Sequence, residues 1–175
     1  MKSLQLLYET RSNNKREFGT TSFDQLVETV ITPEVLQILS GRGYEKILIQ
    51  IGKGDFQPVQ DDTHVEQIIE YYRYKESIES DIREASLVIS HAGAGSVLET
   101  LRARKPLIVV INENLMGNHQ MELAYQLFQD GHLYYCKCGT LKETLASMDE
   151  GQLIPFCGGE PAKFAQFINR VMGVM

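Results

Sequence analysis

One short segment joins a histidine and two glycines between an apolar run and a helical pattern. Residues 90–100 read SHAGAGSVLET, with His91, Gly93 and Gly95 following the apolar run directly. Glycine lets a backbone approach a ligand closely, and the free N–H groups at a helix start attract anions. The segment therefore favours a phosphate-binding turn. It is neither a GxGxxG dinucleotide motif nor a Walker loop, and a bare Gly-x-Gly is weak evidence by itself.

His91 and Glu99 each allow two interpretations. His91 either donates a hydrogen bond to a diphosphate oxygen or bonds a neighbouring loop. Glu99 lies about one turn into the expected helix. It either accepts hydrogen bonds from a ribose diol or stabilises the helix as an acid near its start. The residues themselves leave both pairs of alternatives open.

Two further clusters precede helical patterns. Residues 112–122 (NENLMGNHQME) carry many amide, imidazole and carboxylate groups. Such groups suit the paired donors and acceptors of sugar hydroxyls, although Asn118 also fits a helix cap. Residues 19–22 (GTTS) offer hydroxyls that either touch phosphate or cap a helix, and capping is the safer interpretation for Ser22.

A metal site is not expected. The three cysteines, Cys136, Cys138 and Cys157, together with His132, match no standard zinc spacing. The odd number of cysteines indicates a reducing compartment rather than a disulfide framework.

Positioning these groups requires buried strands followed by helices. Apolar runs predict strands over residues 46–51, 86–90, 107–111 and 133–136. Helical patterns cover residues 23–31, 33–39, 75–85, 95–104, 118–129, 141–148 and 161–172. The alternation predicts an α/β fold with a mostly parallel sheet, whose ligands bind at the carboxyl ends of the strands.

Composition bounds the function. A length of 175 residues is typical of one domain. Acidic residues outnumber basic ones by 23 to 17, so we expect no nucleic-acid partner. We find no apolar run long enough for a membrane span and no signal peptide. We therefore expect a soluble cytosolic domain whose membrane role, if it has one, comes through a partner.

Three segments together resemble a known family. HAGAGSVLETL, KPLIVVINENLMGNHQMELA and GTTSFDQL are similar to the C-terminal donor half of glycosyltransferase family 28. Within it they resemble the catalytic subunits of the UDP-N-acetylglucosamine transferases of dolichol-linked oligosaccharide synthesis. The similarity runs from about residue 19 to residue 173. It implies a Rossmann-like sheet flanked by helices, as one half of a GT-B glycosyltransferase.

The resemblance assigns the site residue by residue, with no cofactor and no metal. It implies contacts to the nucleotide diphosphate from His91, Gly93, Ala94, Gly95 and Ser96, and from Gly19, Thr20 and Thr21 in the first-strand loop. It implies that Glu99 holds the ribose hydroxyls. It places polar groups near the sugar at Asn118, His119, Gln120 and Glu122.

The activity it implies is transfer of N-acetylglucosamine from UDP-GlcNAc to GlcNAc-diphospho-dolichol with inversion, in the N-glycosylation pathway. A membrane-anchored partner subunit would supply the acceptor half of the enzyme. It would dock this chain on the cytosolic face of the endoplasmic reticulum. The general base is not apparent and would come from the partner or the interface.

The N-terminus departs from the family pattern. A short apolar strand normally runs straight into GTTSF, whereas residues 11–18 here are polar and charged. Either residues 4–8 supply the strand after a long loop, or the strand is missing. We therefore divide the chain into an atypical segment, 1–18, and a UDP-sugar-binding domain, 19–175. The departure motivates an alternative function, a catalytically inactive variant that binds the partner or UDP-GlcNAc. A generic nucleotide-binding Rossmann protein is a third hypothesis, disfavoured because GxGxxG is absent.

Overall fold

The computed structural model of the chain describes residues 1–7, 24–52, 67–91, 93–111 and 118–156. Its centre is a six-stranded sheet in which every neighbouring pair is parallel. The strand order is β3-β2-β1-β4-β5-β6. The strands are β1 (Lys2–Leu7), β2 (Tyr44–Gln50), β3 (Ile68–Tyr72), β4 (Leu87–His91), β5 (Leu107–Ile111) and β6 (Tyr134–Lys137).

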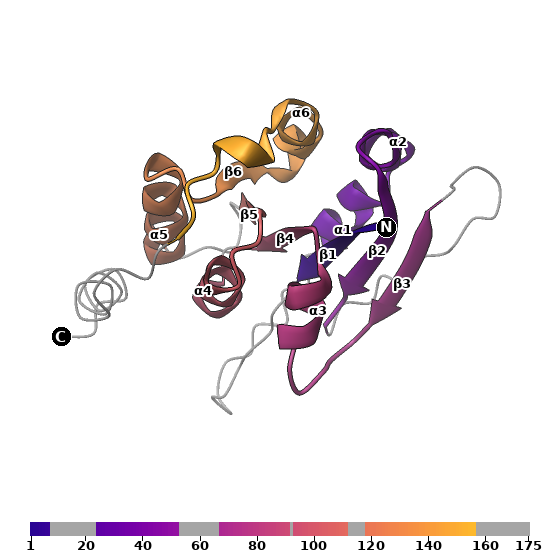
Figure 1. Cartoon of the computed structure of the whole chain (residues 1–175), viewed down its shortest axis with the longest axis horizontal. Helices are drawn as coiled ribbons and strands as arrows, with labels where there is room; N and C mark the ends of the chain where they lie inside the picture. Colours follow the sequence, from indigo (N-terminus) through magenta and orange to yellow (C-terminus); the bar gives the residue numbers. More distant parts are fainter. Residues whose placement is uncertain (8–23, 53–66, 92, 112–117, 157–175) are drawn as a thin grey trace.

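Helices cover both faces of the sheet (Figure 1). The helices are α1 (Asp24–Val30), α2 (Pro33–Gly41), α3 (Glu79–Glu84), α4 (Ala94–Arg102), α5 (Asn118–Gln129) and α6 (Leu141–Ser147). One apolar cluster joins α1, α2 and α6 to one face, and a second joins α3, α4 and α5 to the other. The predicted parallel α/β fold is confirmed, and so are its four predicted strands, with shifts of a residue or two at their ends.

The first strand lies in the middle of the sheet. β1 pairs with β2 on one side and with β4 on the other. Leu4 and Leu6 are fully buried in the first apolar cluster, and Leu7 is fully buried in the second. Of the two alternatives for the N-terminus, the structure has the first, in which residues near Leu4 supply the strand. β1 therefore belongs to the same sheet as the strands of the predicted 19–175 domain.

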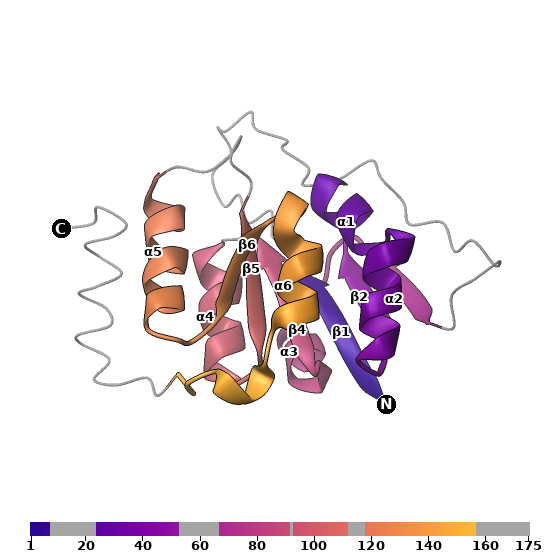
Figure 2. The same ribbon diagram turned by 90° about the horizontal axis from the view of Figure 1, so that it is seen from above.

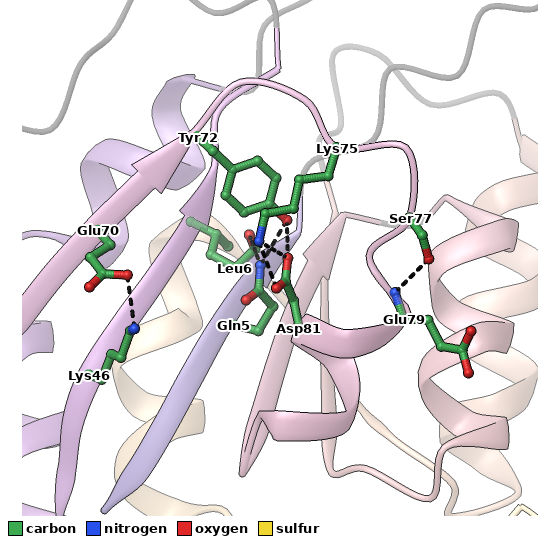
Figure 3. A network of polar contacts seen from close by, with 9 residues as sticks. All are labelled: Gln5, Leu6, Lys46, Glu70, Tyr72, Lys75, Ser77, Glu79 and Asp81. Carbon is green, nitrogen blue, oxygen red and sulfur yellow. Dashed lines mark hydrogen bonds and ion pairs between the residues drawn. The ribbon is translucent and has the colours of Figure 1, made fainter.

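A polar network fixes β1 to β3 and α3 on one face of the sheet (Figure 3). The amide nitrogen of Gln5 lies 3.5 Å from the Tyr72 hydroxyl, which donates to Asp81 at 2.8 Å. Both Asp81 oxygens accept from the Lys75 ammonium at 2.8 Å. Burial, followed by the bond to Asp81, raises the pKa of Tyr72. The phenol therefore stays a hydrogen-bond donor over the whole physiological pH range.

Helix α3 is shorter than predicted. The pattern indicated a helix over residues 75–85, whereas α3 begins at Glu79. The Ser77 hydroxyl accepts a hydrogen bond from the Glu79 N–H at 3.3 Å, which satisfies a donor that the helix start leaves without a partner. Lys75 instead lies in the irregular segment before the helix, where its ammonium reaches Asp81. The predicted helix over 161–172 lies outside the described residues.

The central place of β1 predicts a large cost for truncating its core side chain. Leu6→Ala should lower the free energy of unfolding by about 3 kcal/mol, because it opens a cavity between packed layers. Ile68→Ala on the edge strand β3 is the matched control. Ile68 is 50% exposed, so its truncation should cost about 1 kcal/mol or less. Urea unfolding of both variants gives the comparison, and equal losses would contradict a central β1.

Candidate functional site

The sheet has one topological switch point, between β1 and β4. On one side of this point the sheet continues from β1 through β2 to β3, and on the other side it continues from β4 through β5 to β6. In open α/β sheets, ligands bind in the crevice at the carboxyl ends of the strands at such a point. Leu7 ends β1 and His91 ends β4, so the glycine turn that follows His91 lies at this crevice. In Figure 2 this edge of the sheet lies opposite the end marked N.

Helix α4 starts with backbone donors turned toward that edge. Gly93 is its N-cap, and the Gly93 N–H donates to the His91 carbonyl at 2.7 Å. The first intrahelical bond runs from the Val97 N–H to the Gly93 carbonyl at 3.1 Å. Helix geometry leaves the N–H groups of residues 94–96, at the start of α4, without a partner inside the helix. Donors at the positive end of a helix dipole suit an anion, and we call these three amides the amide cradle.

Space, rather than backbone conformation, limits the side chain at position 93. Its φ is −67°, which any residue adopts. A Cβ built there would lie 2.9 Å from the Nε2 atom and 3.0 Å from the Cε1 atom of His91. The imidazole therefore packs directly against the turn. A side chain at position 93 would displace the imidazole.

His91 is held in its neutral form. Burial lowers its pKa below the ordinary value of 6.5, and a hydrogen bond with the Leu7 backbone opposes that shift. A neutral imidazole has one N–H, and the Leu7 carbonyl can only accept, so the bond to Leu7 uses that proton. The predicted donation from His91 to a diphosphate oxygen therefore requires a second proton on the ring. The role of His91 toward a ligand stays a prediction.

The side chains of α4 divide into a buried and a solvent-facing set. Ser96 and Thr100 are fully buried, and the Ser96 hydroxyl lies 3.3 Å from the Gly93 carbonyl oxygen. Ser96 can therefore meet a ligand at the edge through its N–H rather than its hydroxyl. Gly95 is exposed and Glu99 is partly exposed, four residues further along. This spacing places Glu99 on the same helix face as Gly95, one turn away from the cradle.

The described residues that flank the second predicted cluster lie at the same edge. β5 lies beside β4 and ends at Ile111, and α5 begins at Asn118. Glu122 lies in α5 with its side chain exposed. Residues 112–117, the side chains of Asn118, His119 and Gln120, and the cluster of Gly19, Thr20 and Thr21 lie outside the described residues. Their ligand contacts stay predictions.

Three further features concern the cysteines, metal ligands and membrane-spanning helices. Cys136 and Cys138 are buried and free, and burial raises the pKa of Cys136 to about 12. Among the described residues, no three histidine, cysteine or acidic side chains gather as metal ligands. In that same part of the chain, none of the helices has the length and apolarity to cross a bilayer.

Sequence reasoning missed Ser90, which is fully buried beside the turn. Its hydroxyl donates to the His91 carbonyl at 2.8 Å and lies 3.3 Å from the Ser96 hydroxyl. The signal was a polar residue inside an otherwise apolar strand, directly before His91. It also missed the contact between His91 and the end of β1, which joins positions far apart in the sequence.

A parallel sheet with a glycine turn and an amide cradle at its switch point is typical of a Rossmann-like half-domain. Residues 18–166 match the glycosyltransferase family 28 C-terminal domain. The chain belongs to that family, and its fold is one half of a GT-B glycosyltransferase.

Several curated relatives are named UDP-N-acetylglucosamine transferase subunit ALG13. The human protein is 54% identical over 123 residues, which cover 70% of this chain and 11% of that protein. The Saccharomyces cerevisiae protein is 31% identical over 171 residues, covering 79% of this chain and 84% of that one. The match therefore spans about a tenth of the human relative and most of the yeast one.

Solved structures agree on the fold. An NMR structure of ALG13 superposes with a TM-score of 0.68 and 26% identity, covering 95% of this chain and 94% of that one. The crystal structure of Acinetobacter baumannii MurG superposes with a TM-score of 0.60 and 20% identity, covering 86% of this chain and 42% of that one.

The depressed pKa of His91 predicts a pH-dependent stability. Below about pH 6.5 the unfolded chain binds a proton at this histidine that the folded chain resists. The free energy of unfolding should therefore fall as the pH drops from about 7.5 to about 5.5, and less steeply in His91→Gln. Urea unfolding across this range measures both slopes. An identical slope in the variant would contradict the assignment.

Proposed function

We propose that this chain is the donor-binding subunit of an inverting UDP-GlcNAc transferase of the N-glycosylation pathway. The observation that carries the proposal is the amide cradle of residues 94–96 beside His91, at the switch point of a family 28 domain. Its relatives are named as UDP-N-acetylglucosamine transferase subunits, which supports the same donor here.

In the proposed complex, the cradle binds the diphosphate of UDP-GlcNAc. Glu99 accepts hydrogen bonds from the ribose hydroxyls, one helical turn from Gly95. Asn118, His119, Gln120 and Glu122 contact the sugar from the start of α5, and Gly19, Thr20 and Thr21 meet the diphosphate from the β1 side. The assignment of these residues to the ligand follows the resemblance to the family.

The reaction joins an acceptor hydroxyl oxygen of GlcNAc-diphospho-dolichol to the anomeric carbon of the donor sugar. The bond from that carbon to the diphosphate breaks, and UDP leaves with the electron pair. The amides of the cradle stabilise the charge that develops on UDP, because they are already oriented before the reaction. The acceptor proton passes to a base that the partner or the interface supplies.

The proposed partner is a membrane-anchored subunit that carries the acceptor half of the enzyme. It would hold this chain on the cytosolic face of the endoplasmic reticulum, beside the dolichol-linked acceptor. Support comes from the word subunit in the names of the relatives, and from a fold that is one half of a two-domain architecture.

A second candidate is a catalytically inactive variant that binds the partner or UDP-GlcNAc without turnover. The observation that favours it is the polar stretch of residues 11–18 between β1 and the GTTS segment. A transferase assay with labelled UDP-GlcNAc and a dolichol-type acceptor separates the two. Transfer that depends on the partner supports the enzyme, whereas donor binding without transfer supports the inactive variant.

Replacing Glu99 tests the ribose contact. Glu99→Gln should weaken UDP-GlcNAc binding by about tenfold, because a charge-assisted hydrogen bond becomes a neutral one. Glu143→Gln on α6 makes the same change on the other face of the sheet and should leave the affinity unchanged. Isothermal titration of the full chain, with and without the partner, gives the affinities. Unaltered binding by Glu99→Gln would remove the ribose role.

A further inference from the structure

Two buried hydroxyls lie beneath the glycine turn, on Ser90 and Ser96. Neither residue has exposed surface, and their Oγ atoms are 3.3 Å apart. Ser90 is the last residue but one of β4, whereas Ser96 lies in the first turn of α4. The pair therefore joins the end of the strand to the start of the helix across the interior of the turn.

The two hydroxyls reach the carbonyl groups that shape the turn. The Ser90 hydroxyl donates to the His91 carbonyl at 2.8 Å, and the Gly93 N–H reaches the same oxygen at 2.7 Å. The Ser96 hydroxyl lies 3.3 Å from the Gly93 carbonyl, which also accepts from the Val97 N–H at 3.1 Å. Each of these two carbonyls is thus held by one hydroxyl and one backbone N–H.

Fixing a carbonyl also fixes the amide that shares its peptide plane. The C=O and N–H groups of a trans peptide point in opposite directions. Because the Gly93 carbonyl points toward Ser96 and Val97, the Ala94 N–H points away from the helix and forms part of the amide cradle. The Ser90 hydroxyl supports this arrangement by donating its proton to the His91 carbonyl, and its oxygen packs against the Ser96 hydroxyl.

We propose that Ser90 is a positioning residue for diphosphate binding: its buried hydroxyl holds the turn so that the amides of residues 94–96 converge on the ligand. The inference rests on the proposed function, because it concerns the same donor site. Ser90 itself has no exposed surface and acts through the turn. Loss of its hydroxyl should therefore weaken binding of the diphosphate and leave binding of the nucleoside unchanged.

The test compares two ligands on the full chain. Ser90→Ala should bind UDP about tenfold more weakly than the original chain, and should bind uridine equally well. Ser90→Cys fills the same space with a much weaker donor and should show the same selective loss, which covers the case in which the alanine variant fails to fold. NMR titrations with UDP and with uridine supply both affinities, and thermal unfolding supplies the stability of each variant.

Ser86→Ala is the matched control, since it removes a hydroxyl from the other end of the same segment. The Ser86 oxygen accepts from the Ser3 N–H at 3.3 Å, at the end of β4 opposite the turn. This control should keep both affinities.

The remaining outcomes decide against the inference. Unchanged UDP affinity in both Ser90 variants, or an equal loss for UDP and uridine, overturns it while leaving donor binding intact. An original chain that binds neither ligand overturns the proposed function, and the role of Ser90 with it.

Discussion

The pairing of β1 between β2 and β4 is the constraint on which the other features depend. It places Leu4 and Leu6 in one apolar cluster and Leu7 in the other, so this single strand joins both halves of the core. It also creates the switch point, because the strand order reverses beside it. The Leu7 backbone then bonds to His91, so the end of β1 forms part of the wall of the candidate site. Fold and site thus share one short strand.

The same strand carries a polar residue that sequence reasoning could not place. Gln5 is 2% exposed, although it interrupts an otherwise apolar run. Its amide lies near the Leu6 carbonyl and the Tyr72 hydroxyl, which leads on to Asp81 and Lys75 (Figure 3). Buried polar groups require partners, and the long-range partner of Gln5 is Tyr72 of β3, 67 positions away, which in turn bonds Asp81 of α3. Local periodicity contains no information about such a contact.

Helices and strands can be predicted from the sequence wherever apolar residues repeat regularly along a single element. The buried strands 107–111 and 86–90 and the helix 118–129 were predicted nearly to the residue, because apolar periodicity follows directly from burial on a sheet or a helix face. The place of the glycine turn followed from the rule for parallel sheets. The inward hydroxyl of Ser96 and the protonation of His91 did not follow, since both depend on atoms that only the folded turn brings together.

The close packing of His91 against Gly93 has an evolutionary consequence. A methyl group at position 93 would collide with the imidazole, so alanine there is unfavourable while histidine occupies position 91. If a smaller side chain first replaced the histidine, the same alanine would find room. Substitutions at the two positions are therefore coupled: a side chain at position 93 is accommodated when the ring moves or when a smaller group replaces it.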